Sequence, residues 1–269
     1  MSLIERNNVR HLGEAGPVVV FGHGFGTDGT SWQEVAEPIC AQHRVVLFDH
    51  IGFGRSDRLA FSDRHGSLDG YADDLLEILA SLGVPELVYV GHSIGGVIGL
   101  LASIRQPRLF RRIVLLNSTP HFIDEPATGY VGGFNRRQIE GSLELMGADY
   151  GAWADAIAPM AIGHANSLAQ IQAFGQGLHS LDAMIARRFG RLALFVDVRE
   201  RLAEVRTPVS ILQCVEDEFA PVAVGRYMHE ALPGSSLTLL PASGHCPQIT
   251  QPEIVVDALW EVLALPGPQ

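Results

Sequence analysis

The chain has 269 residues, with Lys+Arg 19 against Asp+Glu 30, so its formal net charge is −11; 47% of its residues are hydrophobic and 18% are charged. The length suits one large α/β domain, and the apolar fraction excludes a disordered chain because there is ample surface to bury. The acidic balance argues against a nucleic-acid-binding protein, since contacts to phosphates need a basic face.

The start of the chain carries no sign of export. Residues 1–14 contain no apolar segment, and no stretch of about 18 apolar residues occurs that lacks glycine or charge. The three cysteines, Cys40, Cys214 and Cys246, are scattered without a CxxC pair, which predicts neither a disulfide framework nor a zinc site. We therefore expect a cytoplasmic protein that binds neither membrane nor metal.

Six short apolar runs rich in β-branched residues recur along the chain, at residues 17–21, 44–48, 87–90, 113–116, 209–214 and 237–240. Continuous apolar character is typical of strands that are buried on both faces. Helical patterns, such as the one at residues 68–82, lie between these runs. The alternation predicts an α/β fold with a mostly parallel sheet and helices on both of its faces.

The alternation stops between about residues 119 and 191. Only helical patterns occupy this stretch, at residues 134–146, 150–162, 167–178 and 182–195. No linker rich in Pro, Gly or Ser sets the stretch off on both sides, so we predict a helical cap inserted at the edge of the sheet. The predicted division is a core of residues 1–118 and 192–269 with a cap of residues 119–191.

The sequence GHSIGG, residues 91–96, stands between a predicted strand and a predicted helix. A serine exposed at such a sharp turn adopts a strained backbone, and glycines two residues before and after it clear the space. The N-terminus of the helix then directs free N–H groups at the charge that develops in the transition state. This context predicts Ser93 as a nucleophile.

A nucleophile of this kind needs an acid and then a histidine, in that chain order. Three carboxylates, on Glu216, Asp217 and Glu218, follow the predicted strand at residues 209–214, and we favour Asp217. After the last predicted strand, Gly244 lets the loop turn sharply, so we expect His245 to project over the strand ends as the base.

Eleven histidines compete for the role of the base. Four of them lie in polar surroundings that predict solvent exposure: His11, His43, His65 and His229. The sequence leaves four others open: His50, His121, His164 and His179. Only His245 follows the last strand on a glycine-containing loop downstream of the acid.

Acyl transfer also needs two backbone N–H donors for the oxyanion. Ile94, directly after the nucleophile, supplies one. The second is expected from GHGFG, residues 22–26, which follows the first predicted strand. Glycines on both sides let the Phe25 N–H face the site while its ring lines the pocket.

Together these segments resemble the RsbQ-type α/β-hydrolases, a group that includes a bacterial stress-response regulator and the plant karrikin and strigolactone receptors. The resemblance covers roughly residues 8–263. It is carried by HGFGTDGTSW (23–32), HRVVLFDHIGFGRSD (43–57), SLDGYADDL (67–75), GHSIGGVIGLLAS (91–103), YVGGF (130–134), LQCVEDEFAPVAVGRYMHEAL (212–232) and SGHCPQ (243–248).

The resemblance implies an α/β-hydrolase fold with a Ser93–Asp217–His245 triad, and it places the oxyanion donors on Phe25 and Ile94. It further implies a V-shaped cap of four helices over a deep apolar pocket. The pocket wall should include Phe25, Phe134 and residues near Ile157, Met160 and Phe195. Residues 156–158 read Ala-Ile-Ala where the plant receptors carry an aromatic, which argues for a differently shaped pocket and against plant-hormone-like ligands.

This machinery predicts two-step acyl transfer on a small apolar ester, without a cofactor. A serine nucleophile excludes the dehalogenase and epoxide hydrolase reactions that use a carboxylate on this fold. One alternative is an RsbQ-like ligand sensor that turns over slowly and regulates a protein partner. Lactone hydrolysis and cleavage of a carbon–carbon bond are further alternatives.

Two basic pairs stand out on the predicted cap of this acidic protein, Arg136–Arg137 and Arg187–Arg188. Solvated helix faces are their simplest interpretation. The alternative hypothesis is a docking surface for a signalling protein.

Overall fold

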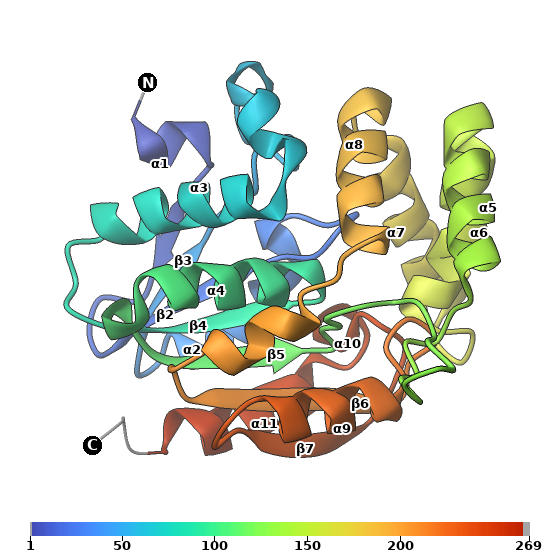
Figure 1. Ribbon diagram of the computed structural model, residues 1–269. Helices are drawn as coiled ribbons and strands as arrows, with labels where there is room; N and C mark the ends of the chain where they lie inside the picture. Colours follow the sequence, from blue (N-terminus) through green and yellow to red (C-terminus); the bar gives the residue numbers. More distant parts are fainter. Residues whose placement is uncertain (1, 266–269) are drawn as a thin grey trace.

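The computed structural model describes residues 2–265 and is built around a seven-stranded sheet in the order β1-β3-β2-β4-β5-β6-β7 (Figure 1). β1 runs antiparallel to β3, and every other neighbouring pair is parallel. The strands are β1 (Arg10–Leu12), β2 (Val18–Gly22), β3 (Arg44–Leu47), β4 (Leu87–His92), β5 (Phe110–Leu116), β6 (Val209–Glu216) and β7 (Ser236–Ser243). The six predicted strands are confirmed. β1 was missed because its three residues form no apolar run.

Helices cover both faces of the sheet. One face packs against α3 (Leu68–Ser81), α4 (Ile94–Arg105) and α9 (Val222–Ala231), and the other packs against α2 (Gln33–Ile39) and α11 (Pro252–Leu263). The shorter helical elements are α1 (Leu3–Arg6), α10 (Pro247–Thr250), η1 (Gly29–Trp32), η2 (Arg58–Ala60), η3 (Asp63–Gly66), η4 (Pro107–Leu109) and η5 (Arg199–Glu204).

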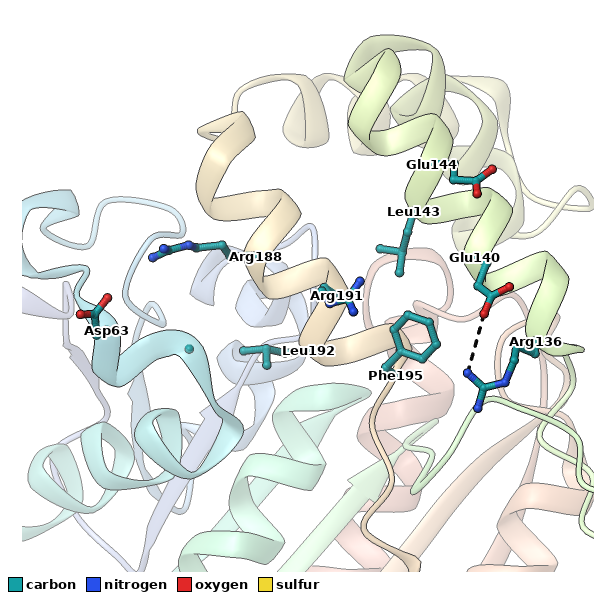
Figure 2. A pocket seen from close by; sticks show the side chains of 10 residues that line it. Asp63, Arg136, Glu140, Leu143, Glu144, Arg188, Arg191, Leu192 and Phe195 are labelled. Carbon is teal, nitrogen blue, oxygen red and sulfur yellow. Dashed lines mark ion pairs between the residues drawn. The ribbon is translucent and has the colours of Figure 1, made fainter.

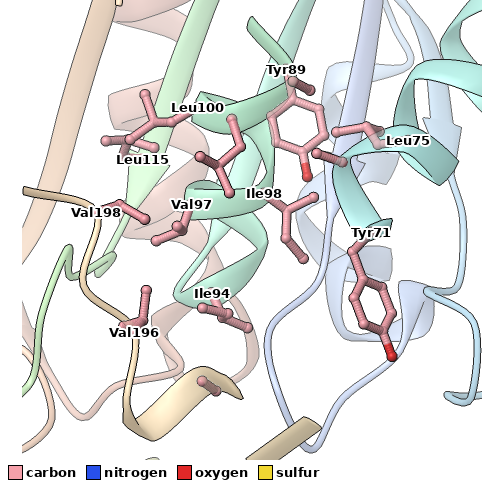
Figure 3. Close-up of a cluster of buried hydrophobic side chains, with 14 of the residues drawn as sticks. Tyr71, Leu75, Tyr89, Ile94, Val97, Ile98, Leu100, Leu115, Val196 and Val198 are labelled. Carbon is pink, nitrogen blue, oxygen red and sulfur yellow. The ribbon is translucent and has the colours of Figure 1, made fainter. Parts of the chain in front are cut away.

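Alternate residues of the central strands point to opposite faces, which divides the buried side chains into two clusters. Tyr89 and Leu115 join the cluster under α3 and α4, where Ile98 packs (Figure 3). Val90 and Leu116 join the cluster on the other face. Burial on both faces explains why these strands are apolar without alternation.

Four helices lie between β5 and β6, namely α5 (Arg136–Ala148), α6 (Tyr150–Ile162), α7 (Leu168–His179) and α8 (Ala183–Leu194). Each begins after a polar residue whose side chain accepts N–H groups of the first turn: Asn135, Asp149, Ser167 and Asp182. Such caps satisfy N–H groups that have no partner within the helix. The four helical patterns in the sequence correspond to these helices, with ends shifted by no more than two residues.

These four helices stand over the carboxyl ends of the strands (Figure 1). The larger hydrophobic cluster continues from the sheet into them and includes Trp153, Phe174 and Phe189. The connections that lead into and out of this insertion meet at a bridge between His121 and Asp197. Among residues 2–265, no helix has the length and apolar character needed to cross a membrane.

Candidate active site

Ser93 lies at the turn from β4 to α4, with φ 52° and ψ −127°. Residues other than glycine rarely adopt such a conformation, which costs on the order of 1–3 kcal/mol. A Cβ atom on Gly91 would lie 2.5 Å from the Gly96 Cα atom, and one on Gly95 would lie 2.3 Å from the His23 carbonyl oxygen. The glycines therefore make the turn possible, and the turn holds Ser93 at the N-terminus of α4.

Ser93, His245 and Asp217 form one chain of hydrogen bonds. The Ser93 hydroxyl oxygen lies 2.8 Å from Nε2 of His245, and Nδ1 of the same ring lies 2.8 Å from Oδ2 of Asp217. When Nδ1–H donates to the carboxylate, Nε2 is left to accept the hydroxyl proton. Oδ1 of Asp217 accepts the backbone N–H groups of Phe219 and Ala220 at 2.8 and 3.1 Å, which fixes the orientation of the carboxylate.

The loop that carries His245 is held by both the sheet and α6. Gly244 has φ 96°, and a Cβ atom there would lie 2.0 Å from the Ile162 carbonyl oxygen. The His245 N–H donates to the Ala161 carbonyl at 2.8 Å, while the His245 carbonyl accepts from Nε2 of His92 at 2.8 Å. Glycine is needed at position 244 because the C-terminal end of α6 lies so close.

Burial separates the three neighbouring carboxylates. Asp217 is 9% exposed and contacts His245, whereas Glu216 and Glu218 are exposed. Glu218 lies 3.6 Å from the exposed His164. Of the three, only Asp217 is placed to orient the imidazole.

The prediction of solvent exposure for four histidines was half wrong. His11 and His229 are exposed, but His43 and His65 are buried. Nε2 of His65 lies 2.7 Å from Asp74, and the His43 ring packs 5.7 Å from the ring of Trp260. Both contacts come from residues distant in sequence, so the local polar context gave no sign of them. Of the four histidines that were left open, His50 and His121 are buried, whereas His164 and His179 are exposed.

Two further histidines, His23 and His92, are buried behind the site together with His50. Burial lowers the pKa of His23 and holds the pKa values of His50 and His92 well below the usual value for histidine, so these rings are neutral at pH 7. Nε2 of His23 accepts the His50 N–H at 2.9 Å and thereby fixes the loop after β2 to the loop after β3.

An apolar cavity of about 60 Å³ opens over Ser93. Its lining comes from the core and from α6, α7 and α8: Phe25, Ser93, Ile94, Phe122, Trp153, Ile157, Ala161, Phe174, Leu178, Ala193, Leu194, Phe219, His245 and Cys246. Sequence reasoning missed most of the cap residues in this set, because helical periodicity identifies an apolar face but not the neighbour that it meets.

Of the predicted wall residues, the structure places Phe25 and Ile157 in the cavity lining. Phe134 lies one layer behind, with its ring 6.2 Å from Phe122 and 5.9 Å from Phe219.

Two other predicted wall residues, Met160 and Phe195, do not line the cavity, so the prediction was wrong for them. Met160 lines a surface hollow beside Asp217, and Phe195 lines a groove on the outer side of the cap. The rotation of α6 explains the position of Met160, because it turns Ile157 and Ala161 toward Ser93 and Met160 away from it.

Phe25 and Ile94 line the same cavity as Ser93. Neither N–H has a hydrogen-bond acceptor within residues 2–265. Ile94 is the first residue of α4, where a helical N–H has no partner of its own. Two free donors beside a serine hydroxyl match what an oxyanion requires.

One group of possible metal ligands lies at the base of the cap, where His121, Glu125 and Asp197 bring ligand atoms within 4.8 Å of one another. Arg199 pairs with Glu125 at 2.9 Å and with Asp197 at 2.6 Å, and its guanidinium lies 4.7 Å from the ring centroid of Tyr130. The arginine forms ion pairs with both carboxylates, which leaves one net negative charge in the group. The group is therefore best described as an ion-pair network that joins the two connections of the cap.

Figure 2 shows the groove on the outer side of the cap, between α5 and α8. The volume of this groove is about 910 Å³. Its charged lining consists of three arginines and three carboxylates: Arg136, Arg188, Arg191, Asp63, Glu140 and Glu144. Arg136 lies 3.7 Å from Glu140, and Arg191 lies over the ring of Phe195 at 5.4 Å. The formal charges balance, so the groove is not basic.

The two predicted basic pairs are split by the fold. Arg136 and Arg188 line the outer groove, whereas Arg137 is exposed without lining it. Nε of Arg187 donates to the Met146 carbonyl at 2.9 Å and so connects α8 to α5.

Comparison with known proteins gives a consistent result. A family model for the alpha/beta hydrolase fold matches residues 17–152. A probable esterase of Oryza sativa subsp. japonica is 39% identical, over 95% of this chain and 94% of its own length. A karrikin insensitive 2 receptor of Petunia hybrida is 36% identical, over 93% of this chain and 92% of its own length. The solved structure of a hydrolase from Oleispira antarctica has a TM-score of 0.94 at 33% identity, covering 97% of this chain and 96% of that one.

Proposed function

This chain belongs to the α/β-hydrolase family and is related to the karrikin and strigolactone receptor esterases, and on that premise we propose that it is a serine hydrolase that cleaves small, largely apolar esters. The observation that carries the proposal is the continuous hydrogen-bonded chain from Ser93 through His245 to Asp217 beneath an apolar cavity. No metal or organic cofactor is needed for this chemistry.

In the first step, Oγ of Ser93 attacks the ester carbonyl carbon while its proton passes to Nε2 of His245. Asp217 holds the ring in the required tautomer and stabilises the imidazolium. The Phe25 and Ile94 N–H groups stabilise the oxyanion, and each such donor contributes about 3–4 kcal/mol in comparable enzymes. The imidazolium then protonates the departing alcohol oxygen, and an acyl-enzyme remains.

In the second step, His245 takes a proton from water as that water attacks the acyl carbon. The second tetrahedral intermediate collapses, the carboxylic acid leaves, and Oγ of Ser93 recovers its proton from the imidazolium. A lactone ring fits the same sequence of steps, with the alcohol and the acid remaining in one molecule.

The cavity supports a substrate with a short acyl group. Its volume of about 60 Å³ lies far below the roughly 300–1,000 Å³ of sites that take drug-sized ligands. Its lining is apolar apart from Ser93 and His245, so a charged acyl group would lose its hydration without compensation.

A second candidate is a signalling hydrolase that turns over its ligand slowly while a protein partner reads the state of the cap. The relative named as a karrikin insensitive 2 receptor supports this alternative. The hydrogen bond from the His245 N–H to the Ala161 carbonyl also supports it, because this bond joins the base directly to a cap helix. The balanced charge of the outer groove gives no support to docking through a basic patch.

The test is a stopped-flow and steady-state assay with p-nitrophenyl esters from acetate to octanoate, using Ser93→Ala as the control. We expect Ser93-dependent turnover that is fastest on short chains, at ordinary enzyme rates of about 1–10³ s⁻¹. In Ser93→Ala the rate should fall by about 10⁵–10⁶-fold.

Two other outcomes are informative. A burst of one equivalent followed by very slow turnover would mean that the acyl-enzyme persists, and the signalling alternative would then replace the esterase. Undiminished activity in Ser93→Ala would overturn the proposed mechanism.

A further inference from the structure

A second recess lies on the other side of the cavity wall. This groove of about 390 Å³ runs between α7 and the segment from Gly26 to the start of α2, and its floor includes α10. The alcohol-side groove, as we name it, is lined by Gly26, Thr27, Asp28, Thr30, Ser31, Gln33, Glu34, Gln170, Ala173, Phe174, Gly177, Gln248 and Ile249.

One aromatic ring separates the alcohol-side groove from the cavity over Ser93. Phe174 lines both spaces, and Leu178 completes the wall on the cavity side. Both side chains pack on the oxyanion loop, since a Cβ atom on Gly26 would lie 2.7 Å from Cδ2 of Leu178 and 3.3 Å from Cζ of Phe174. Phe174 is therefore the side chain that would have to move for one ligand to occupy both spaces.

Gln248 lines this groove with a buried side-chain amide that lacks hydrogen-bond partners within residues 2–265. The residue is 1% exposed, and neither Oε1 nor Nε2 of its amide has a hydrogen-bond partner within residues 2–265. A buried amide without partners is costly, and native proteins rarely keep one without a use for it. Gln248 stands three residues after His245, in helix α10, which follows directly on the loop that carries the base.

The charged residues around the groove restrict the kinds of ligand that it can bind. Among residues 2–265, no lysine or arginine lines it, while Asp28 and Glu34 contribute carboxylates. An anionic group would be repelled there, and the acid product of hydrolysis is anionic. The charges therefore assign the acyl part to the apolar cavity and the alcohol part to the groove, and the unpartnered Gln248 amide favours an alcohol part that both donates and accepts hydrogen bonds.

We propose that the alcohol-side groove binds the alcohol part of the substrate, and that Gln248 selects alcohols bearing a neutral carboxamide or lactam group. Such a group offers one acceptor and one donor and therefore satisfies both atoms of the glutamine amide. This inference rests on the proposed esterase function and adds to it the substrate class on the leaving-group side.

The test compares two butyrate esters, one of 4-hydroxybenzamide and one of 4-isopropylphenol, in which an isopropyl group of the same shape replaces the carboxamide. In Gln248→Met, kcat/KM for the amide ester should fall about tenfold, the loss expected when a buried polar contact is removed. The isopropylphenyl ester should be unaffected, because its ring substituent has neither a donor nor an acceptor for the glutamine. Equal changes for both esters, or none for either, would overturn the proposal.

Thermal unfolding separates ligand binding from a structural role. Removing an unpartnered buried amide should leave the Tm of Gln248→Met unchanged or raise it. A lower Tm would mean that the amide has structural partners, and the proposal would fail. Gln176→Met, the same change at an exposed position of α7 outside the groove lining, is the control.

A binding measurement keeps this inference separate from the proposed function. Calorimetric titration of the intact amide ester into Ser93→Ala should give a dissociation constant about tenfold lower than titration into the Ser93→Ala and Gln248→Met double variant. Equal affinities would overturn the groove assignment. If the native protein hydrolyses no ester but this difference in affinity persists, the esterase proposal fails and the groove assignment stands.

Discussion

The carboxyl edge of the sheet and the helical cap both line the cavity around Ser93, but they position their residues in different ways. The sheet edge uses backbone geometry, with a left-handed turn at Ser93, a glycine before His245 and strand ends that place Asp217. The cap contributes apolar side chains, including Trp153 and Phe174, whose positions depend on helix packing. From this difference we infer that the core carries the chemistry and that the cap selects the acyl group.

The two regions are connected at one point that matters for the chemistry. The N–H of His245 donates to the carbonyl of Ala161 on α6. The comparison therefore predicts that substitutions in the hydrogen-bonded chain of Ser93, His245 and Asp217 affect every ester alike, whereas cap substitutions affect esters according to their acyl length. The following experiments test that distinction.

The largest effect is expected at the acid in the core. Asp217→Asn should lower kcat by about 10⁴-fold on every ester, because the amide favours the wrong tautomer of His245. Glu216→Gln and Glu218→Gln should leave kcat unchanged, since both side chains are exposed and neither contacts the ring. Steady-state kinetics on the ester panel measures this. A comparable loss in either glutamate variant would transfer the acid role to that residue.

A smaller and selective effect is expected in the cap. Ala161→Leu adds three carbons to the cavity wall, so kcat/KM for the octanoate ester should fall about tenfold or more while the acetate ester changes little. Ala152→Leu, at an exposed position on the same helix, is the control. If Ala161→Leu slows acetate and octanoate equally, the effect comes from the contact with His245, and the division between chemistry and selection breaks down.

The last effect concerns stability, not catalysis, and lies in the core behind Ser93. His50 and His92 have folded-state pKa values well below their unfolded values because they are buried. Below a pH of about 6.5 the unfolded chain therefore binds more protons than the folded one, and the free energy of unfolding falls as the pH falls. We expect a loss of up to about 2 kcal/mol between pH 6.5 and 5.5, because each of the two histidines contributes up to about 1 kcal/mol over this interval.

Denaturant titrations across this pH range measure that loss. His92→Gln should make the pH dependence shallower, because it removes one of the two histidines while keeping a donor for the His245 carbonyl. His11→Asn, at an exposed position on β1, should leave the pH dependence as it is. An unchanged slope in His92→Gln would mean that this ring takes no part in the acid destabilisation.

The fold was largely predictable because its strands are buried on both faces and its cap helices have polar N-caps. Both features leave a local signature in the sequence, and so does the glycine pattern around Ser93. β1 lacked such a signature, since its three residues pair at the edge of the sheet. His65 was wrongly predicted as exposed because its partner, Asp74, reaches it only in the folded chain.

The sequence by itself determined the order of the strands along the chain, the turn at Ser93 and the short set of residues that could serve as acid and base, because these depend on local backbone requirements. The tertiary structure decided which of three adjacent carboxylates meets His245, which face of α6 lines the cavity, and that Gln248 is buried beside a groove with its amide unpartnered. Each of these depends on how helices rotate and loops approach one another, and such distances between remote residues leave no periodic trace in the chain.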